Sequence, residues 1–444
     1  MKLKDLNNKT IALFGFGIEN QAMLKYLLKA KVSAQFVVYD LRSMDDLKDR
    51  IKEFEKKKNI VWLFNGVTDK KLFEATIVFR SPGWPLFCPV VKKMQELCAT
   101  ISSPMQLFCD LCPTKKLIGI TGTKGKGTTS SLIATILKTA GKSVYLGGNI
   151  GVAPFLFLDK LKKSDYVVLE LSSFQLEDMK ASFRAAVLTN FSPEHLKPAD
   201  PNNPNFHKNL AEYFFAKLNI LRYLNKDSRA FVNINLQNKF NNAKLKKEID
   251  VSKINYFKKS ELPSRLVGEH NKENISAAEE CVKFFGISQK HITKAVKEFT
   301  GLEHRIEFVA KQDGIAYYDD SFATISDATI IALKSFQEPI ILIAGGADKG
   351  NDFDRLAREI KKRVKFLVLF AGVAMPRIKE ALKKVSYDST RMIEVNSMSS
   401  AIKAVRSHAV SGDIILLSPA CASFGIFKNY KERGDMFKKE VLGK

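Results

Sequence analysis

The sequence predicts an α/β protein of three domains, in which mostly parallel sheets are packed between helices. Short apolar runs of four to six residues recur along the chain, each bounded by turn signals and separated from the next by a stretch of helical periodicity. Such runs are typical of strands that are buried on both faces of a parallel sheet. A chain of 444 residues is longer than one hydrophobic core usually serves. We place the domains at residues 1–104, 105–301 and 302–444.

The first domain opens with a strand, a glycine turn, a helix and a second strand. The apolar run that begins at Lys9 reaches Gly15 and Gly17, a helical pattern covers Asn20–Lys31, and the next apolar run ends on Asp40. This is the layout of a mononucleotide-binding βαβ unit. Asn20 stands where a dinucleotide-binding turn has its third glycine, so we do not expect a dinucleotide cofactor.

The second domain carries the most informative motif, the glycine-rich loop TGTKGKGTT at residues 121–129. It follows the apolar strand Leu117–Ile120 and precedes the helical pattern Ser130–Ala140. Glycines free backbone N–H groups to converge on phosphate oxygens, the helix dipole favours negative charge, and Lys126 can neutralise it. The loop therefore predicts that the chain binds a nucleoside triphosphate. Because Gly127 follows the lysine, the hydroxyl group for Mg²⁺ must come from Thr128 or Thr129.

Further short apolar runs continue the same alternation with helices. The expected strands are Thr76–Phe79, Ser143–Leu146, Tyr166–Leu171, Ala185–Leu188, Ile315–Tyr318, Ile340–Ala344, Phe366–Phe370 and Ile414–Leu417, and a helix is expected over Leu210–Leu224. Polar residues follow three of the central strands: Asn149, Glu170 and His195. Since open parallel sheets bind ligands at the carboxyl ends of their strands, these side chains suit Mg²⁺-assisted phosphoryl transfer.

Composition excludes several classes of protein. Lysine and arginine number 71 against 47 acidic residues, but the excess is spread along the chain, without the motifs of a nucleic-acid-binding domain. No apolar run approaches the ~18 residues of a membrane span, and Ile11–Ile18 is better explained as a buried strand than as a signal peptide. The six cysteines form no disulfide framework, and we interpret the C-x-x-C pair Cys109 and Cys112 as chance. We expect a cytoplasmic protein.

The motifs together are recognisable. In order they are TGTKGKGTT, GGNIG, ELSSFQLE, NFSPEH with a later FAK, GEHNKENISAA, FTGLEHRIE, DDSFAT, GGADKG and LSPACASFGIFKNYKERGDMF. This set resembles the Mur ligase family over essentially the whole chain. The last run, Leu417–Phe437, resembles the members that add D-glutamate to UDP-N-acetylmuramoyl-L-alanine.

The resemblance implies a fold, a reaction and its cofactors. The implied domains are a Rossmann-like unit for the UDP end of the substrate, a central P-loop ATPase, and a Rossmann-like unit that binds glutamate. The implied reaction is the ATP-dependent addition of D-glutamate to UDP-N-acetylmuramoyl-L-alanine, through an acyl phosphate, in peptidoglycan synthesis. It would use two Mg²⁺ ions and a carbamylated lysine at Lys217. We expect a monomer that acts on small molecules, without nucleic acid or a membrane span.

The resemblance also implies roles for individual residues. The residues implied to bind ATP are Gly122, Thr123, Lys124, Gly125, Lys126, Gly127, Thr128, Thr129, Asn274, Arg305 and Asp320. Those implied to bind the UDP substrate are Gly15, Gly17, Ile18, Glu19, Asp40, Arg42 and Asn149, and those implied to bind glutamate are Thr324, Lys349, Ser423 and Tyr430. The implied Mg²⁺ ligands are Thr128, Glu170, His195 and Lys217, and the implied catalytic residues are Lys126, His195 and Lys217.

Three alternatives stay open. The first is the same ligation with L-glutamate, because Phe322 stands where members that use D-glutamate often have a lysine. The second is a ligase similar to folylpolyglutamate synthase, which Gly127 favours and the separate βαβ unit before the phosphate loop disfavours. The third is a basic nucleotide-dependent binding protein without ligase activity. The assignment of Lys217 also depends on its helix returning to the phosphate loop after a long, proline-rich segment.

Overall fold

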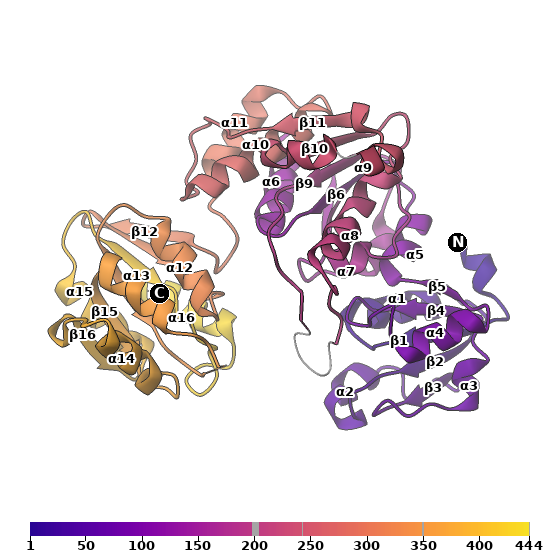
Figure 1. Cartoon of the computed structure of the whole chain (residues 1–444), viewed down its shortest axis with the longest axis horizontal. Helices are drawn as coiled ribbons and strands as arrows, with labels where there is room; N and C mark the ends of the chain where they lie inside the picture. The colour runs from indigo at the N-terminus through magenta and orange to yellow at the C-terminus, as the bar shows by residue number, and fades with distance from the viewer. Residues whose placement is uncertain (198–203, 242, 349, 444) are drawn as a thin grey trace. The chain divides into compact units, whose positions relative to one another are not determined.

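Five parallel strands form the first sheet. Its strands are β1 (Thr10–Phe14), β2 (Gln35–Tyr39), β3 (Ile60–Leu63), β4 (Ile77–Arg80) and β5 (Thr100–Ser102), and its helices are α1 (Ile18–Lys29), α2 (Met44–Ile51), α3 (Lys70–Phe73) and α4 (Pro89–Glu96). The order is β3-β2-β1-β4-β5 (Figure 1). Ile11 and Leu13 pack with α1 and α2, whereas Ala12 and Phe14 pack with α3 and α4. Helices thus cover both faces, which is why β1 is continuously apolar.

Six parallel strands form the second sheet. Its strands are β6 (Leu117–Thr121), β7 (Val144–Gly148), β8 (Tyr166–Glu170), β9 (Ala185–Leu188), β10 (Arg229–Asn233) and β11 (Ile254–Phe257), and its helices are α5 (Pro104–Leu111), α6 (Lys126–Thr139), α7 (Ser173–Leu176), α8 (Leu210–Arg222), α9 (Ala243–Glu248), α10 (Glu269–Lys283) and α11 (Gln289–Glu298). The order is β11-β10-β9-β6-β8-β7. Ile120 pairs with Glu170, and Thr121 pairs with Leu188. The carboxyl ends of β8 and β9 therefore flank the end of β6, where the phosphate loop begins.

The third sheet has six strands, of which only β12 (Glu307–Gln312) is antiparallel to its neighbour. The other strands are β13 (Ile315–Asp319), β14 (Ile340–Ala344), β15 (Val364–Phe370), β16 (Met392–Val395) and β17 (Ile414–Leu417), and the helices are α12 (Ser326–Lys334), α13 (Asp354–Arg363), α14 (Met375–Lys384), α15 (Met398–His408) and α16 (Tyr430–Leu442). The order is β12-β13-β17-β14-β15-β16. Leu342 packs with α12, α13 and α14, and Ile343 packs with α15 and α16.

The computed structural model describes residues 1–197, 204–241, 243–348 and 350–443. The chain divides into two compact units, Met1–Ser260 with Glu273–Ala295 and Glu261–Lys272 with Val296–Lys444. The first unit contains the first two sheets, and the second unit contains the third sheet. The predicted α/β fold with mostly parallel sheets is confirmed, while the domain limits at residues 104 and 301 stay predictions. None of the helices within the described residues combines the length and the apolar character needed to span a bilayer.

Helix α6 differs from the sequence pattern at its start. The pattern begins the helix at Ser130, but the helix begins at Lys126, directly after Gly125 with its left-handed φ of +79°. Such a backbone conformation favours glycine, and it ends the loop abruptly. The second half of the phosphate loop is therefore the first turn of the helix, whose N–H groups have no partner within the helix.

The first two sheets are joined by the side chain of Arg80, at the end of β4. Its exposed fraction is 1%, and its Nε donates to Asp178 Oδ2 at 3.0 Å while Nη1 lies 3.4 Å from Glu177 Oε2. The guanidinium also donates to the carbonyl oxygens of Trp84 and Phe174. One buried cation therefore connects the first sheet to α7 and the residues after it.

Replacing Arg80 should destabilise the first unit strongly. In Arg80→Ala, the half-buried carboxylates of Asp178 and Glu177 would lose their cation, so we expect the free energy of unfolding to fall by roughly 3 to 5 kcal/mol. Denaturant titration followed by circular dichroism measures the change. Lys93→Ala, which removes the exposed ion pair with Glu96, is the matched control and should change stability by less than about 1 kcal/mol. Equal effects of the two substitutions would contradict the role of Arg80.

Candidate functional site

The phosphate loop connects β6 to α6 and has a backbone that requires glycine. Gly122 has a φ of +148°, and a Cβ atom there would overlap the hydroxyl oxygen of Thr189. A Cβ atom at Gly125 would overlap the side-chain oxygen of Asn274. Thr129 is buried and its hydroxyl donates to the same Asn274 oxygen at 3.4 Å, whereas Thr128 is partly exposed. The loop is thus a tight cradle for a small anion at a helix N-terminus.

Two lysine side chains meet at one backbone oxygen of this loop. Lys217 Nζ donates to the carbonyl oxygen of Gly122 at 2.7 Å, and Lys126 Nζ donates to the same oxygen at 3.0 Å. Lys126 Nζ also donates to the carbonyl oxygen of Thr123 at 2.9 Å. Helix α8, which carries Lys217, therefore does return to the phosphate loop after the long segment that precedes it.

The ammonium group of Lys217 lies in an unusual place for a charge. The side chain is 1% exposed, and its Nζ lies 4.6 Å from the centre of the Tyr213 ring. Within the described residues, no carboxylate forms an ion pair with it. Burial, together with the nearby charge of Lys126, holds the pKa of the Lys217 amine well below its usual value. A neutral amine is thus favoured at this position.

Glu170 ends β8 beside the start of the phosphate loop. Its Oε1 accepts a hydrogen bond from Asn149 Nδ2 at 2.8 Å, and its backbone oxygen accepts one from the Asn149 N–H at 2.9 Å. A Cβ atom at Gly148 would overlap that same backbone oxygen. The glycine pair of the motif GGNIG therefore allows the two strand ends to approach, and Asn149 fixes one carboxylate oxygen of Glu170.

His195 follows β9 and has a left-handed backbone, with a φ of +59°. Such a conformation is strained for a residue with a side chain and is concentrated at functional sites. Its ring contacts Phe174 and Tyr213, with ring centres 5.1 and 5.8 Å apart. Burial and the charges of three lysines lower the pKa of the imidazole, although Glu194 opposes them. The neutral ring that results is the form that binds metal ions.

His207 is a neighbour that sequence analysis missed. Its exposed fraction is 1%, its Nε2 lies 2.9 Å from Ser173 Oγ, and its ring stacks on Phe174. The N–H of His207 donates to the carbonyl oxygen of His195 at 2.9 Å. Burial, with the charges of His195 and Lys217, lowers the pKa of His207 to about 4. A lone histidine before a helix gives no sequence signal of this contact.

The residues predicted to bind the UDP substrate lie at the carboxyl edge of the first sheet, except Asn149, which follows β7 of the second sheet. Asp40 is 3% exposed and accepts hydrogen bonds from the Phe16 N–H at 2.6 Å and from Arg42 Nε and Nη2 at 2.9 and 2.8 Å. Although burial opposes it, these bonds lower the pKa of Asp40.

Gly15 has a φ of +78°, and a Cβ atom there would overlap Ser81. Gly17 caps α1, and Ile18 beside it is 53% exposed.

Glu19 reaches from α1 to the second sheet. Its Oε1 accepts a hydrogen bond from Gln175 Nε2, whereas its Oε2 is buried without a partner. Burial raises the pKa of this carboxyl group to about 7, although Gln175 and Arg80 oppose the shift. Glu19 and Arg80 therefore both bind α7 and attach it to the first sheet.

The second unit contains the other predicted residues. Asp320 accepts hydrogen bonds from Ser418 Oγ at 2.7 Å and from the Ile306 N–H at 3.2 Å, and burial raises its pKa to about 8. Ser423 is buried, Thr324 and Tyr430 are half-buried, and Arg305 is exposed. Lys349 lies outside the described residues. Because Arg305 and Asp320 belong to one unit and Asn274 to the other, their joint role at one nucleotide stays a prediction.

Comparison with known proteins decides the family. Family models match residues 10–88 (MurD N-terminal domain), 120–258 (Mur ligase middle domain) and 304–421 (Mur ligase, glutamate ligase domain). Relatives from Clostridium tetani and Clostridium novyi, each named UDP-N-acetylmuramoylalanine--D-glutamate ligase, are each 36% identical to the chain; they cover 99% and 98% of it, and the matches include 97% of each relative. This chain belongs to the Mur ligase family.

A solved Mur ligase structure supports the fold. The MurF ligase from Thermotoga maritima, solved in complex with ADP, is 15% identical and gives a TM-score of 0.54 over 100% of this chain and 97% of its own. At this identity the likeness concerns the fold alone.

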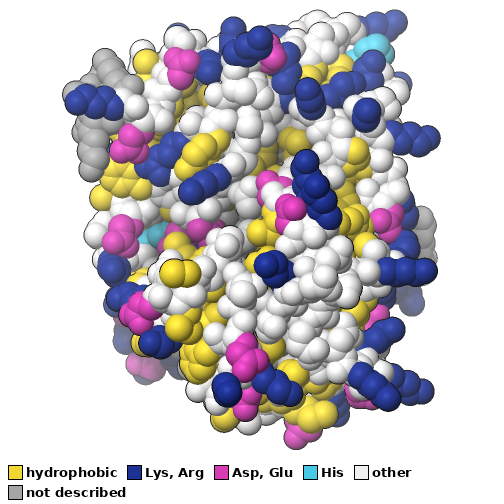
Figure 2. All heavy atoms as spheres, turned by 90° about the vertical axis from the view of Figure 1, so that its right-hand side faces the viewer, with side chains coloured by type: hydrophobic (Ala, Val, Ile, Leu, Met, Phe, Trp, Pro, Cys, Tyr) yellow, Lys and Arg dark blue, Asp and Glu magenta, His cyan; other side chains and the backbone are white. Residues whose placement is uncertain are grey.

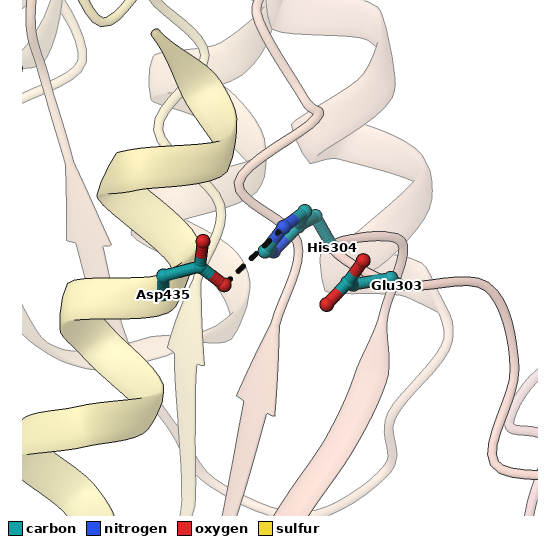
Figure 3. A group of neighbouring side chains, drawn as sticks. All are labelled: Glu303, His304 and Asp435. Carbon is teal, nitrogen blue, oxygen red and sulfur yellow. Dashed lines mark ion pairs between the residues drawn. The ribbon is translucent and has the colours of Figure 1, made fainter. Parts of the chain in front are cut away.

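The potential metal-ligand groups of the described residues lie in the second unit rather than at the phosphate loop. They are Glu303 with His304 and Asp435, shown in Figure 3, and His304 with Glu307 and Asp319. Lys438 Nζ lies 2.9, 3.4 and 3.5 Å from carboxylate oxygens of Glu303, Glu307 and Asp435. An ammonium group already pairs with three of these carboxylates, so we interpret the cluster as an ion-pair network of the second unit.

Two further features concern the surface charge and the cysteines. Figure 2 shows lysine and arginine side chains scattered over the face in view rather than gathered in one stripe, which differs from the basic footprint of a nucleic-acid-binding protein. Burial raises the pKa of the Cys109 thiol, and it raises that of Cys112 to about 11. Protonated thiols are poor nucleophiles and metal ligands, and the interpretation of the C-x-x-C pair as chance stays a prediction.

Glu19 should make stability depend on pH. The unfolded chain releases the Glu19 proton near pH 4.5, whereas the folded chain holds it up to about pH 7, so stability falls as pH rises between these values. Glu19→Gln removes this loss, and we expect it to stabilise the protein by on the order of 1 to 3 kcal/mol at pH 8 and little at pH 4.5. Thermal unfolding across this pH range measures the difference. The exposed Glu55→Gln is the control, and a pH-independent effect of Glu19→Gln would contradict the prediction.

Proposed function

We propose that this Mur ligase joins the carboxylate of UDP-N-acetylmuramoyl-L-alanine to the amine of D-glutamate, using ATP, in peptidoglycan synthesis. One combination of findings carries the proposal. Two lysines converge on the glycine-rich phosphate loop, and relatives that are 36% identical over nearly their whole length are named for this reaction. We also propose a cytoplasmic monomer.

The chemistry explains why the cradle is positively charged. A carboxylate is a poor acylating agent, so its oxygen attacks the γ-phosphorus of ATP, ADP leaves, and an acyl phosphate forms. The neutral amine of glutamate then attacks the acyl carbon, phosphate leaves, and the amine loses a proton. Both steps develop negative charge on oxygen. Preorganised donors that meet this charge stabilise the transition state.

The first unit offers suitable donors for the phosphates. The N–H groups in the first turn of α6 have no partner within the helix, and the Lys126 ammonium lies over the loop, bound to two of its carbonyl oxygens. Both carbonyls carry only partial charge, so a phosphate oxygen would be a better partner for the ammonium. We assign Lys126 and the loop N–H groups to the β and γ phosphates.

The donor set beside the loop suits Mg²⁺ in part. Glu170 offers a carboxylate, Thr128 a partly exposed hydroxyl and His195 a neutral imidazole, and Mg²⁺ prefers oxygen ligands. Bound Mg²⁺ would neutralise charge on the transferring phosphoryl group. Asn149 holds one Glu170 oxygen, the Phe174 ring packs against the His195 ring, and the His207 N–H holds the His195 carbonyl oxygen, so this chain's own residues restrain both side chains.

A carbamate at Lys217 would add a further oxygen ligand. We assign the modification to Lys217 because the side chain is buried at the phosphate loop, close to a second lysine and without a carboxylate partner among the described residues. The neutral amine would attack the carbon of CO₂ and release one proton, which replaces a buried neutral group by a negative one. The carbamate would attract the neighbouring Lys126 ammonium.

The handedness of glutamate is the finer part of the proposal. The names of the relatives favour D-glutamate, while Phe322 removes a cation that could pair with a substrate carboxylate. L-glutamate is therefore the second candidate. A ligase similar to folylpolyglutamate synthase is disfavoured because a complete βαβ sheet precedes the phosphate loop.

Phosphate release tests the function directly. With UDP-N-acetylmuramoyl-L-alanine and ATP present, we expect turnover with D-glutamate to exceed that with L-glutamate, and Lys126→Ala to reduce turnover at least ~100-fold through loss of charge stabilisation. Lys138→Ala changes an exposed lysine of the same helix and should retain activity. Preferential use of L-glutamate would correct the substrate, and full activity of folded Lys126→Ala would contradict the nucleotide site.

Lys217→Ala should be nearly inactive and partly rescued by acetate. A short carboxylate that enters the vacated space can replace the oxygens of a carbamate, whereas an amine such as ethylamine cannot. Turnover is measured with rising acetate, and ¹³C NMR with labelled bicarbonate tests the carbamate in the unsubstituted protein. Lys226→Ala, at an exposed position after the same helix, is the control. Rescue by ethylamine but not by acetate would show that an ammonium group is needed instead.

A further inference from the structure

Phe322 contacts two predicted substrate-binding residues of the second unit at once. The Arg305 guanidinium lies over the Phe322 ring, with its carbon 3.8 Å from the ring centre. On another side, the ring meets Tyr430 edge to face, with ring centres 5.0 Å apart. Phe322 is also 40% exposed, so it contributes less to the core than most phenylalanines of this fold. Packing in the hydrophobic core therefore does not explain the contacts of Phe322 with Arg305 and Tyr430.

The backbone of Phe322 is held from both sides. Its N–H donates to the carbonyl oxygen of His304 at 3.0 Å. The preceding residue, Ser321, accepts a hydrogen bond from Arg433 Nε at 2.9 Å, and its carbonyl oxygen accepts one from Arg433 Nη2 at 2.8 Å. The Ser321 hydroxyl in turn donates to the Tyr430 carbonyl oxygen at 2.7 Å. The Phe322 ring is thus presented at a fixed place.

The backbone of Arg305 is equally constrained. His304 and Ile306, on its two sides, have left-handed φ values of +62° and +47°, which is a strained conformation, above all for a β-branched residue. The His304 ring is fixed by Asp319, whose Oδ2 lies 2.7 Å from Nδ1. The guanidinium at the end of the long Arg305 side chain is the part that lies over the Phe322 ring.

We propose that Phe322 is a positioning residue that orients Arg305 for ATP and Tyr430 for glutamate. The ring attracts the guanidinium through its π-face and packs edge to face with the tyrosine ring. It thereby orders two residues by contact and needs no charge of its own. This inference rests on the proposed function, because the roles of Arg305 and Tyr430 come from the Mur ligase family.

The proposal predicts a KM effect that depends on an aromatic ring. Phe322→Leu should raise the KM for ATP and for glutamate by about 3- to 10-fold, the size of one cation–π and one aromatic contact, and should change kcat and thermal stability little. Phe322→Tyr keeps the ring and should behave as the unsubstituted enzyme. Phe284→Leu is the matched control, since it removes another arginine–phenylalanine contact, with Arg184, in the first unit, and should leave both KM values unchanged.

A double-mutant cycle with Arg305→Ala separates positioning from simple packing. If Phe322 acts on ATP through Arg305, then Phe322→Leu should raise the KM for ATP no further in the Arg305→Ala background. Binding of a non-hydrolysable ATP analogue, measured by fluorescence without turnover, should repeat this pattern. Phe322→Lys is a second variant, in which an ammonium group would repel the guanidinium and raise the KM for ATP at least as far as Phe322→Leu does.

The outcomes are distinct from those of the proposed function. Lack of ligation by the unsubstituted enzyme with either glutamate enantiomer would refute the function, and the nucleotide-binding cycle would still test Phe322. An unchanged KM for ATP in Phe322→Leu, additive effects with Arg305→Ala, or failure of Phe322→Tyr to preserve the KM would overturn the positioning role.

Discussion

The backbone carbonyl of Gly122 accepts hydrogen bonds from two lysine side chains, and much of the first unit is arranged around this contact. A carbonyl oxygen carries a partial charge, so it cannot neutralise two ammonium groups. The surroundings favour the neutral forms of Lys217 and His195, and the helix N-terminus adds further positive potential. Binding of an anion therefore stabilises the phosphate loop, and the conformation of the loop depends on whether an anion is bound.

The sequence predicted the fold well where strands are buried and poorly where they are not. Central strands such as β6, β9 and β14 are continuous apolar runs, and they stand where the pattern placed them. The strands β3, β12 and β16 lie at sheet edges and are partly exposed, so their sequences lack the uniform apolar character that marks a buried strand. The start of α6 was missed because the decisive signal is the backbone angle of Gly125, which sequence periodicity does not contain.

Site prediction divides along a similar line. The membership in the Mur ligase family is confirmed, and the structure brings Lys126, Lys217 and Gly122 together, although their chemical roles stay predictions. His207, Tyr213 and Arg433 could not be found in this way. Each acts through a contact with a residue far away in the sequence: His207 with Phe174, Tyr213 with Thr123, and Arg433 with Ser321. A local sequence motif does not predict such a contact.

The hydrogen bonds and ion pairs of Arg80 also determine where the chain can be cut into fragments. A fragment that ended before β6 would keep the arginine but lose Asp178, Glu177 and the carbonyl of Phe174. The Arg80 guanidinium and the Glu19 carboxyl group would then be exposed to solvent, on a surface that packs against α7 in the full chain. Anyone screening small molecules against the predicted UDP-binding edge should therefore express the first two sheets as one polypeptide. Hits obtained on a shorter fragment would include compounds that bind the Arg80 and Glu19 surface, which contacts α7 in the full chain.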